Sequence, residues 1–233
     1  MDTPVKLSCP SHGLGDTLLL TSVCKHFLAN KKKAVVSLPV KIQRFSILFD
    51  GLADVVIEDG NYHMPDIGGG HYATRKLRNF FPNAEHLDYR PLVLHSNPES
   101  EAWAAKYLAD KPRPLIVVPN CAKQWHQVRS IEPLQFKHLL YQVRMVGFTP
   151  IICSNSSNPV VVDEGHHVLT DLDLSRYICL MRQAGQYFGC NTGDLHLAVA
   201  VGAECQVFQP SDHPLFSREE WDYKHPTIQY YKL

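Results

Sequence analysis

The chain has 233 residues, which is enough for one large domain or two small ones. Hydrophobic residues make up 45% of it and charged residues 20%, as in an ordinary water-soluble globular fold. Its 23 lysines and arginines balance its 23 aspartates and glutamates, so the bulk charge does not indicate a duplex nucleic-acid partner.

Targeting signals and metal motifs are not evident. The opening MDTPVKLSCP lacks the basic and apolar regions of a secretory signal, and the longest apolar runs are too short to span a bilayer. We therefore expect a cytoplasmic protein without an integral membrane segment. The seven cysteines are odd in number and form no C-x-x-C, which favours buried, reduced thiols. The histidines show no zinc-binding spacing, and we expect no metal site.

Hydrophobic periodicity predicts alternating strands and helices in the first half of the chain. Because strands and helices alternate with short loops between them, the strands should pair in parallel with right-handed crossovers. Residues 59–85 read as a long polar loop with one short helix. The expected elements are strands at 5–9, 34–38 and 54–57 and helices at 16–30, 41–49 and 99–109.

The same alternation restarts after Lys111-Pro112-Arg113-Pro114, which we take as a domain boundary. The predicted α/β domains therefore span residues 1–110 and 111–233. We expect the aromatic tail, from Trp221 to Tyr231, to pack back on the first domain; an intermolecular interface is the alternative. The second half is expected to hold strands at 115–118, 149–153, 186–189 and 205–208 and helices at 133–146, 174–184 and 194–201.

The strongest local signal is the turn Asn191-Thr192-Gly193-Asp194 between a predicted strand and an apolar helix. The first turn of a helix has unpaired N–H groups and partial positive charge, and Gly193 lets a ligand approach the backbone. Thr192 and His196 can add donors, so the turn suits a phosphate. The alternative is a plain turn capped by Asn191 or Thr192.

A second candidate segment, Pro119-Asn120-Cys121-Ala122-Lys123-Gln124-Trp125, follows a predicted strand directly. This is the edge of an open α/β sheet at which ligands bind. Lys123 can neutralise a phosphate there, although an ordinary surface lysine is the alternative.

A third segment, Gly13-Leu14-Gly15-Asp16, follows the first predicted strand. It is not a dinucleotide fingerprint, because Leu18 stands where a third glycine is needed, and no Walker sequence follows. Asp16 can act as a general base or merely stabilise the start of a helix. His12 is the alternative proton acceptor.

These three segments together resemble the ADP-heptose:lipopolysaccharide heptosyltransferases. Residues 13–21, GLGDTLLLT, look like the family's G-x-G-D-x-L-x-x-T opening. Lys123-Gln124-Trp125 resembles its K-x-W segment, and residues 189–200 resemble its D-[ST]-G-x-x-H-x-A-x-A segment. The segments occur in the family's order and cover about 35 residues well.

The resemblance implies a GT-B fold, with two Rossmann-like domains facing across a cleft. The first domain would take a hydroxyl-bearing acceptor, most simply a carbohydrate, on a loop with His12, Gly13 and Gly15. The second would take a nucleoside-diphosphate sugar, with no metal or further cofactor, and transfer the sugar with inversion. Asp16 would be the catalytic base. The donor site would comprise Asn120, Lys123, Asn191, Thr192, Gly193, Asp194 and His196.

The chain also departs from the family. Asn191 replaces the usual aspartate, and the segment 154–158, SNSSN, lacks the family's glutamate near the ribose, the nearest acids being Asp163 and Glu164. The chain is also shorter than family members, so neither heptose nor lipopolysaccharide is assumed. Three alternatives remain: a non-catalytic nucleotide-sugar binding protein, a glycosyltransferase acting on nucleic acid through the basic residues 75–78, and a nucleotide-sugar epimerase.

Overall fold

The structure is a computed structural model of the chain, and it describes residues 4–8, 13–58, 72–83, 89–120, 130–157, 159–209 and 222–232. His12, Lys123 and Trp221, which the sequence analysis singles out, lie outside these ranges. The fold is α/β, as predicted, and divides into two compact units that we describe separately.

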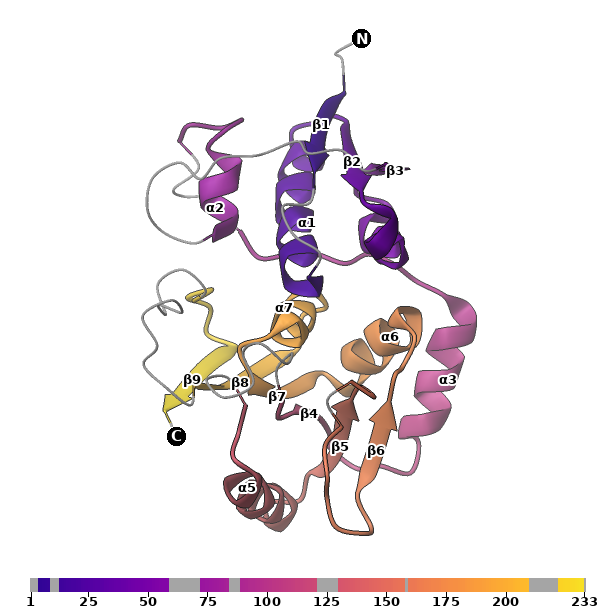
Figure 1. The fold of residues 1–233 in the computed structure, drawn as a ribbon, viewed down its shortest axis with the longest axis vertical. Coiled ribbons are helices and arrows are strands. Elements are labelled where there is room, and N and C mark those ends of the chain that lie inside the picture. Colours follow the sequence, from indigo (N-terminus) through magenta and orange to yellow (C-terminus); the bar gives the residue numbers. More distant parts are fainter. Residues whose placement is uncertain are drawn as a thin grey trace. The chain divides into compact units, whose positions relative to one another are not determined.

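The first unit is built on a three-stranded parallel sheet of order β1-β2-β3 (Figure 1). The chain passes from β1 (Val5–Ser8) through α1 (Leu14–Ala29) to β2 (Ala34–Leu38), and then through η1 (Val40–Phe49) to β3 (Asp54–Ile57). Each parallel step therefore carries a helical crossover, as the sequence predicts.

Packing around α1 holds this unit together. Most of the helix is buried, including Leu18, Leu19 and Phe27. The Phe27 ring lies 5.2 Å, centroid to centroid, from both Phe80 and Phe81, which follow the short helix α2 (Tyr72–Leu77). The predicted helix at 41–49 is instead a 3-10 helix, broken at Ile42, where φ is −120°. Helices of this kind occur in short pieces because their hydrogen-bond geometry is poorer.

The second unit contains a six-stranded, all-parallel sheet of order β6-β5-β4-β7-β8-β9. Helix α5 covers one face of it, and α6 and α7 cover the other (Figure 1). The strands are β4 (Pro114–Val118), β5 (Thr149–Ser154), β6 (His167–Thr170), β7 (Gln186–Cys190), β8 (Glu204–Gln209) and β9 (Ile228–Lys232); the helices are α3 (Pro98–Leu108), α5 (Pro133–Met145), α6 (Leu174–Ala184) and α7 (Gly193–Ala200).

Successive side chains along a strand point to opposite faces of the sheet, and apolar residues at both sets of positions explain why both faces are buried. Leu115 and Val117 of β4 pack with Phe136 and Leu140 of α5, while Ile116 between them points to the other face. Near-continuous apolar strands of this kind are typical of parallel sheets covered by helices on both faces.

Two edge strands were missing from the sequence prediction. Strand β6 has the sequence HVLT and is largely exposed, so it lacks a hydrophobic signal. Strand β9 comes from the aromatic tail, where Tyr231 stacks on Phe208 of β8 with ring centroids 5.5 Å apart. Tyr230 and Tyr231 therefore complete the second sheet rather than returning to the first unit.

Another part of the tail does group with the first unit, namely residues 222–224. The Tyr223 ring stacks on Tyr89 at 6.2 Å, and the Tyr89 hydroxyl donates to the Asp222 carbonyl oxygen at 3.2 Å. Among the tail aromatics that the structure describes, Tyr223 therefore groups with the first unit, and the wider return of the tail stays a prediction.

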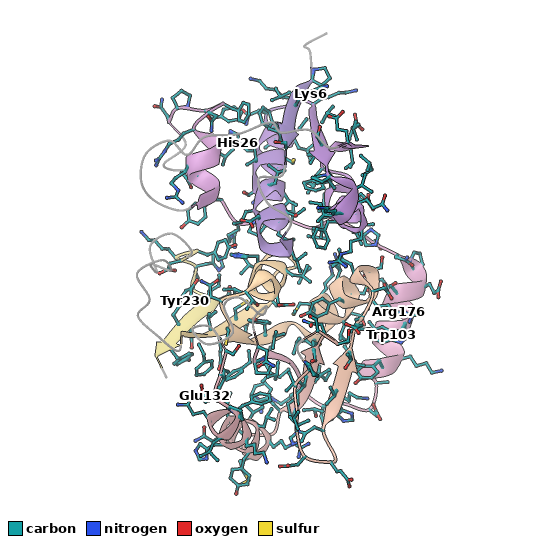
Figure 2. All side chains as sticks on the ribbon, viewed as in Figure 1. Lys6, His26, Trp103, Glu132, Arg176 and Tyr230 are labelled. Atoms are coloured by element: carbon teal, nitrogen blue, oxygen red, sulfur yellow. The ribbon has the colours of Figure 1, made fainter. Side chains whose placement is uncertain are left out.

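The junction between the units lies between His95 and Ser96, and not at residue 111 as expected from Lys111-Pro112-Arg113-Pro114. Helix α3 consequently belongs to the second unit, because it packs on α6. Arg182 donates to Glu101 at 2.9 Å, and the Arg176 guanidinium lies over the Trp103 ring at 5.5 Å; Figure 2 labels the latter pair. These side-chain contacts with α6 place α3 in the second unit, and the composition of the sequence around residue 111 does not reveal them.

The five cysteines in the described ranges are free and buried, as expected: Cys24, Cys153, Cys179, Cys190 and Cys205. Burial raises the pKa of the Cys24 and Cys205 thiols to about 12. Within the same ranges, no helix is long and apolar enough to cross a membrane.

Candidate functional site

The strand order of the second unit identifies a topological switch point between β4 and β7. From β4 the sheet grows to β5 and β6 on one side and to β7, β8 and β9 on the other. Ligands of open α/β sheets bind outside the carboxyl ends of the strands at such a point. The residues that follow these two strands are Pro119-Asn120 and Asn191-Thr192-Gly193, which the sequence analysis had proposed for the donor.

The turn between β7 and α7 presents the N-terminus of a buried helix. Thr192 is the N-cap residue, and its backbone carbonyl accepts from the Leu195 N–H at 3.2 Å. Its Oγ1 accepts from the Asp194 N–H at 3.3 Å. Within the described part of the chain, the Gly193 N–H takes no hydrogen-bond partner. An open amide at the positive end of a helix dipole is suited to an anion.

The Thr192 side chain is a helix cap and faces inward. Only 7% of the residue is exposed, and its hydroxyl donates to Asp194 Oδ2 at 2.9 Å. Because that proton is committed to Asp194, Thr192 offers a ligand its backbone rather than its hydroxyl. The sequence analysis left open that Thr192 is only a helix cap, and this is the role that its side chain has in the structure.

His196 lies one turn further along α7 and is also buried, with 4% of its surface exposed. The neighbouring helix residues from Leu195 to Ala200 are buried as well. The structure therefore places this histidine inside the unit and not on a solvent-facing rim. Asn191 and Gly193 are the partly exposed residues of the turn, together with Asp194.

Tyr177, which the sequence analysis did not single out, contacts this turn from α6. Its hydroxyl donates to Asp194 Oδ1 at 2.9 Å. Burial and the Asp194 charge raise the Tyr177 pKa well above its usual value, so the phenol stays protonated and remains a donor. Both Asp194 oxygens thus accept hydrogen bonds from side-chain hydroxyls.

Gly189 keeps β7 close to β4 directly below the turn. A Cβ at this position would lie 2.5 Å from the Val118 carbonyl oxygen and 2.6 Å from the Tyr187 hydroxyl. That hydroxyl donates to the Cys190 carbonyl oxygen at 2.9 Å, so the buried Tyr187 ring folds back beneath the strand end. Only glycine fits this close approach.

The carboxyl end of β4 anchors the second candidate segment on both sides. The Pro119 carbonyl oxygen accepts from the Ile131 N–H at 2.9 Å, and Cys190 Sγ of β7 lies 3.5 Å from the same oxygen. The chain therefore leaves the sheet at Asn120 and returns to the same point. Lys123 lies in the segment between, outside the described residues.

An acid that the sequence analysis missed lies at the neighbouring strand ends. Asp171, just after β6, accepts from the Ser156 N–H at 3.0 Å, and this bond lowers its pKa. Asp163, one of the two acids named from the sequence, instead pairs with Lys137 of α5 at 3.0 Å. Asp171 was missed because β6 itself was missed.

Asp16 lies in the first unit, in the first turn of α1. Gly13 is the N-cap residue, and its carbonyl oxygen accepts from the Thr17 hydroxyl at 2.9 Å. Thr17 and Leu18 are buried, whereas Gly13 is exposed and Gly15 and Asp16 are partly exposed. The carboxylate is therefore accessible on a rigid helix end, which suits a base and equally suits a helix-stabilising acid.

Metal ligands do not gather in the described ranges, where no group of three or more histidines, cysteines, aspartates or glutamates is placed to hold an ion. The sequence prediction of a metal-free site stays a prediction.

Comparison with known proteins gives structural neighbours only. No protein-family model matches the chain. No curated sequence matches it either. The fold resembles E. coli ADP-heptose lipopolysaccharide heptosyltransferase II, with a TM-score of 0.75 and 10% identity over 99% of this chain and 91% of that one. It resembles a Veillonella parvula family 9 glycosyl transferase, with a TM-score of 0.71 and 12% identity over 100% and 88%.

A third neighbour is the dodecameric, iron-containing heptosyltransferase TibC in complex with ADP-D-beta-D-heptose, with a TM-score of 0.63 and 15% identity over 91% of this chain and 60% of that one. At identities this low, the three likenesses show the fold alone. They confirm the predicted α/β fold and show that it resembles the fold of heptosyltransferases.

Proposed function

We propose that the chain is a glycosyltransferase that takes a nucleoside-diphosphate sugar as donor and a hydroxyl-bearing acceptor, most simply a carbohydrate. One observation carries the proposal: the partly exposed turn at Gly193, with an open amide at a helix N-terminus, lies at the switch point of a six-stranded parallel sheet. In the neighbour TibC, a nucleotide sugar is the bound ligand.

The leaving group explains why such a turn would matter. When the bond from the anomeric carbon to the diphosphate breaks, negative charge develops on the departing oxygen. Preorganised N–H groups and a helix dipole stabilise that charge in the transition state. We assign this role to the backbone of Gly193 and to Lys123, with Asn120 and Asn191 completing the donor site and His196, buried in α7, as a further candidate.

Acceptor activation is assigned to Asp16. The acceptor oxygen attacks the anomeric carbon as the diphosphate leaves from the opposite side, which inverts the configuration in one displacement. The hydroxyl proton would pass to the Asp16 carboxylate, acting as general base. His12 and the glycines Gly13 and Gly15 would shape the acceptor loop, with His12 as the alternative base.

Metal independence is also part of the proposal. A lysine and a helix N-terminus supply positive potential without an ion. Because the neighbour TibC contains iron, it is informative to test whether this chain needs a metal ion. If it does, the ion rather than Lys123 and the helix N-terminus would stabilise the charge of the leaving group.

A non-catalytic binding protein is the second candidate, because Asn191 replaces an acid and the Thr192 hydroxyl is committed to Asp194. A panel of nucleotide sugars, incubated with and without carbohydrate acceptors, separates the two. Release of nucleoside diphosphate together with a glycosylated product supports the transferase. Thermal stabilisation by the donor without any release would instead identify the binding protein.

A further inference from the structure

The Asp194 carboxylate presents an electrostatic problem at the proposed donor site. It lies in the first turn of α7, one residue after the open Gly193 amide. A carboxylate at this position is attracted to the helix N–H groups, just as a phosphate is. Left unrestrained, it would occupy the amides that the ligand needs and would also repel the ligand.

Two side-chain hydroxyls restrain this carboxylate. Tyr177 donates to Oδ1 and Thr192 donates to Oδ2, each at 2.9 Å. Thr192 belongs to the turn itself, whereas Tyr177 comes from the neighbouring helix α6 and therefore fixes the direction of the carboxylate from outside. The raised pKa of Tyr177, which is partly exposed, keeps the phenol proton available for this bond.

We propose that Tyr177 is a positioning residue of the anion site: it holds the Asp194 carboxylate toward α6 and so keeps the first-turn amide of α7 open for a phosphate. The inference rests on the proposed function, because it assumes that a diphosphate binds this turn. Without the Tyr177 hydroxyl, Oδ1 loses this donor, and the amides of its own turn, Gly193 N–H included, are the donors nearest in sequence.

The test uses the full chain and two probes, inorganic pyrophosphate and a panel of nucleoside diphosphates, with affinities from calorimetry at low salt. Tyr177→Phe should weaken binding of both about tenfold, the equivalent of one lost charge-related interaction. Tyr141→Phe is the matched control, since it removes the same hydroxyl from an exposed tyrosine of α5. It should bind like wild type.

Rescue distinguishes positioning from a merely structural role. The double variant Tyr177→Phe/Asp194→Asn has no charge to compete with the ligand and should recover the affinity of Asp194→Asn. If the double variant stays as weak as Tyr177→Phe, the loss came through the fold and the proposal is overturned. Equal binding by Tyr177→Phe and wild type overturns it too, while leaving the donor site intact.

Two further outcomes are decisive. If Tyr177→Phe does not fold, the single variant Asp194→Asn carries the test, and it should bind pyrophosphate several-fold more tightly than wild type; unchanged or weaker binding refutes the inference. If wild type binds neither pyrophosphate nor any nucleoside diphosphate, the inference and the proposed donor site fall together.

Discussion

Gly189→Ala should destabilise the pairing of β7 with β4 at the switch point, and the size of the effect can be estimated from the structure. The added Cβ would lie 2.5 Å from the Val118 carbonyl oxygen, which belongs to the backbone of the neighbouring strand, and 2.6 Å from the Tyr187 hydroxyl. Neither atom is the end of a flexible chain, because β4 pairs with β7 and the Tyr187 ring is fully buried. Overpacking of this kind costs about 1–3 kcal/mol.

The cost should fall on β4 and β7 and on the turn they support. Hydrogen exchange measures it directly, as a lower free energy of opening for the amides of these strands, with the first unit as internal reference. Nucleoside-diphosphate affinity should fall in parallel, because Cys190 and Asn191 move with the strand end. Tyr187→Phe removes the hydroxyl, one of the three atoms that lie within 3.0 Å of the added Cβ, so its combination with Gly189→Ala should cost less than the sum of the single changes. Unchanged protection in Gly189→Ala would refute the reasoning.

Asp16→Asn should lower turnover on the order of a hundredfold, with donor affinity kept and about 1 kcal/mol or less of stability lost; near-normal turnover would make Asp16 a structural residue. Lys123→Ala should weaken nucleoside-diphosphate binding more at low salt than at high salt, and equal binding at low salt would remove Lys123 from the site. Turnover should survive chelators, and a strict metal requirement would contradict the proposed charge stabilisation. Glu101→Gln should make the free energy of unfolding fall less steeply as the pH is lowered. Burial alone would raise the Glu101 pKa, but hydrogen bonds from Gln183 and Cys179 and the Arg182 charge lower it overall. The Glu101 contribution is therefore present above the usual carboxyl pKa and lost as pH falls through the lowered one, and identical acid unfolding of the variant would contradict this.

Much of the fold could be predicted from the sequence because the inner strands are strongly apolar. Strands β2 and β3 and helix α6 have the predicted bounds, and most other predicted elements shift by a residue or two at their ends. Those signals come from local periodicity, which a single chain displays directly. The switch point follows from the same alternation once the order of the strands is known.

The prediction failed where tertiary contacts override composition. Strand β6 is short and exposed, and β9 is an edge strand in an aromatic tail, so neither has the hydrophobic pattern of an inner strand. Helix α3 joins the second unit through Arg182 and Glu101, although Lys111-Pro112-Arg113-Pro114 suggested a boundary after it. Charge pairs between distant residues leave no local signal in the sequence.

The candidate site shows the same limit at the level of side chains. The spacing of Thr192, Gly193 and His196 was sufficient to predict a helix N-terminus after a strand. It was insufficient to predict that Thr192 and His196 face inward or that Tyr177 contacts Asp194 from another helix. Side-chain direction depends on the neighbouring helix, which spacing along one segment does not specify.

A structure of the chain with a bound nucleoside diphosphate would locate the donor site. We predict a diphosphate oxygen within hydrogen-bond distance of the Gly193 amide nitrogen, with the Asp194 carboxylate still bound to Tyr177. A nucleotide bound elsewhere on the chain, with the turn at Gly193 unoccupied, would contradict it.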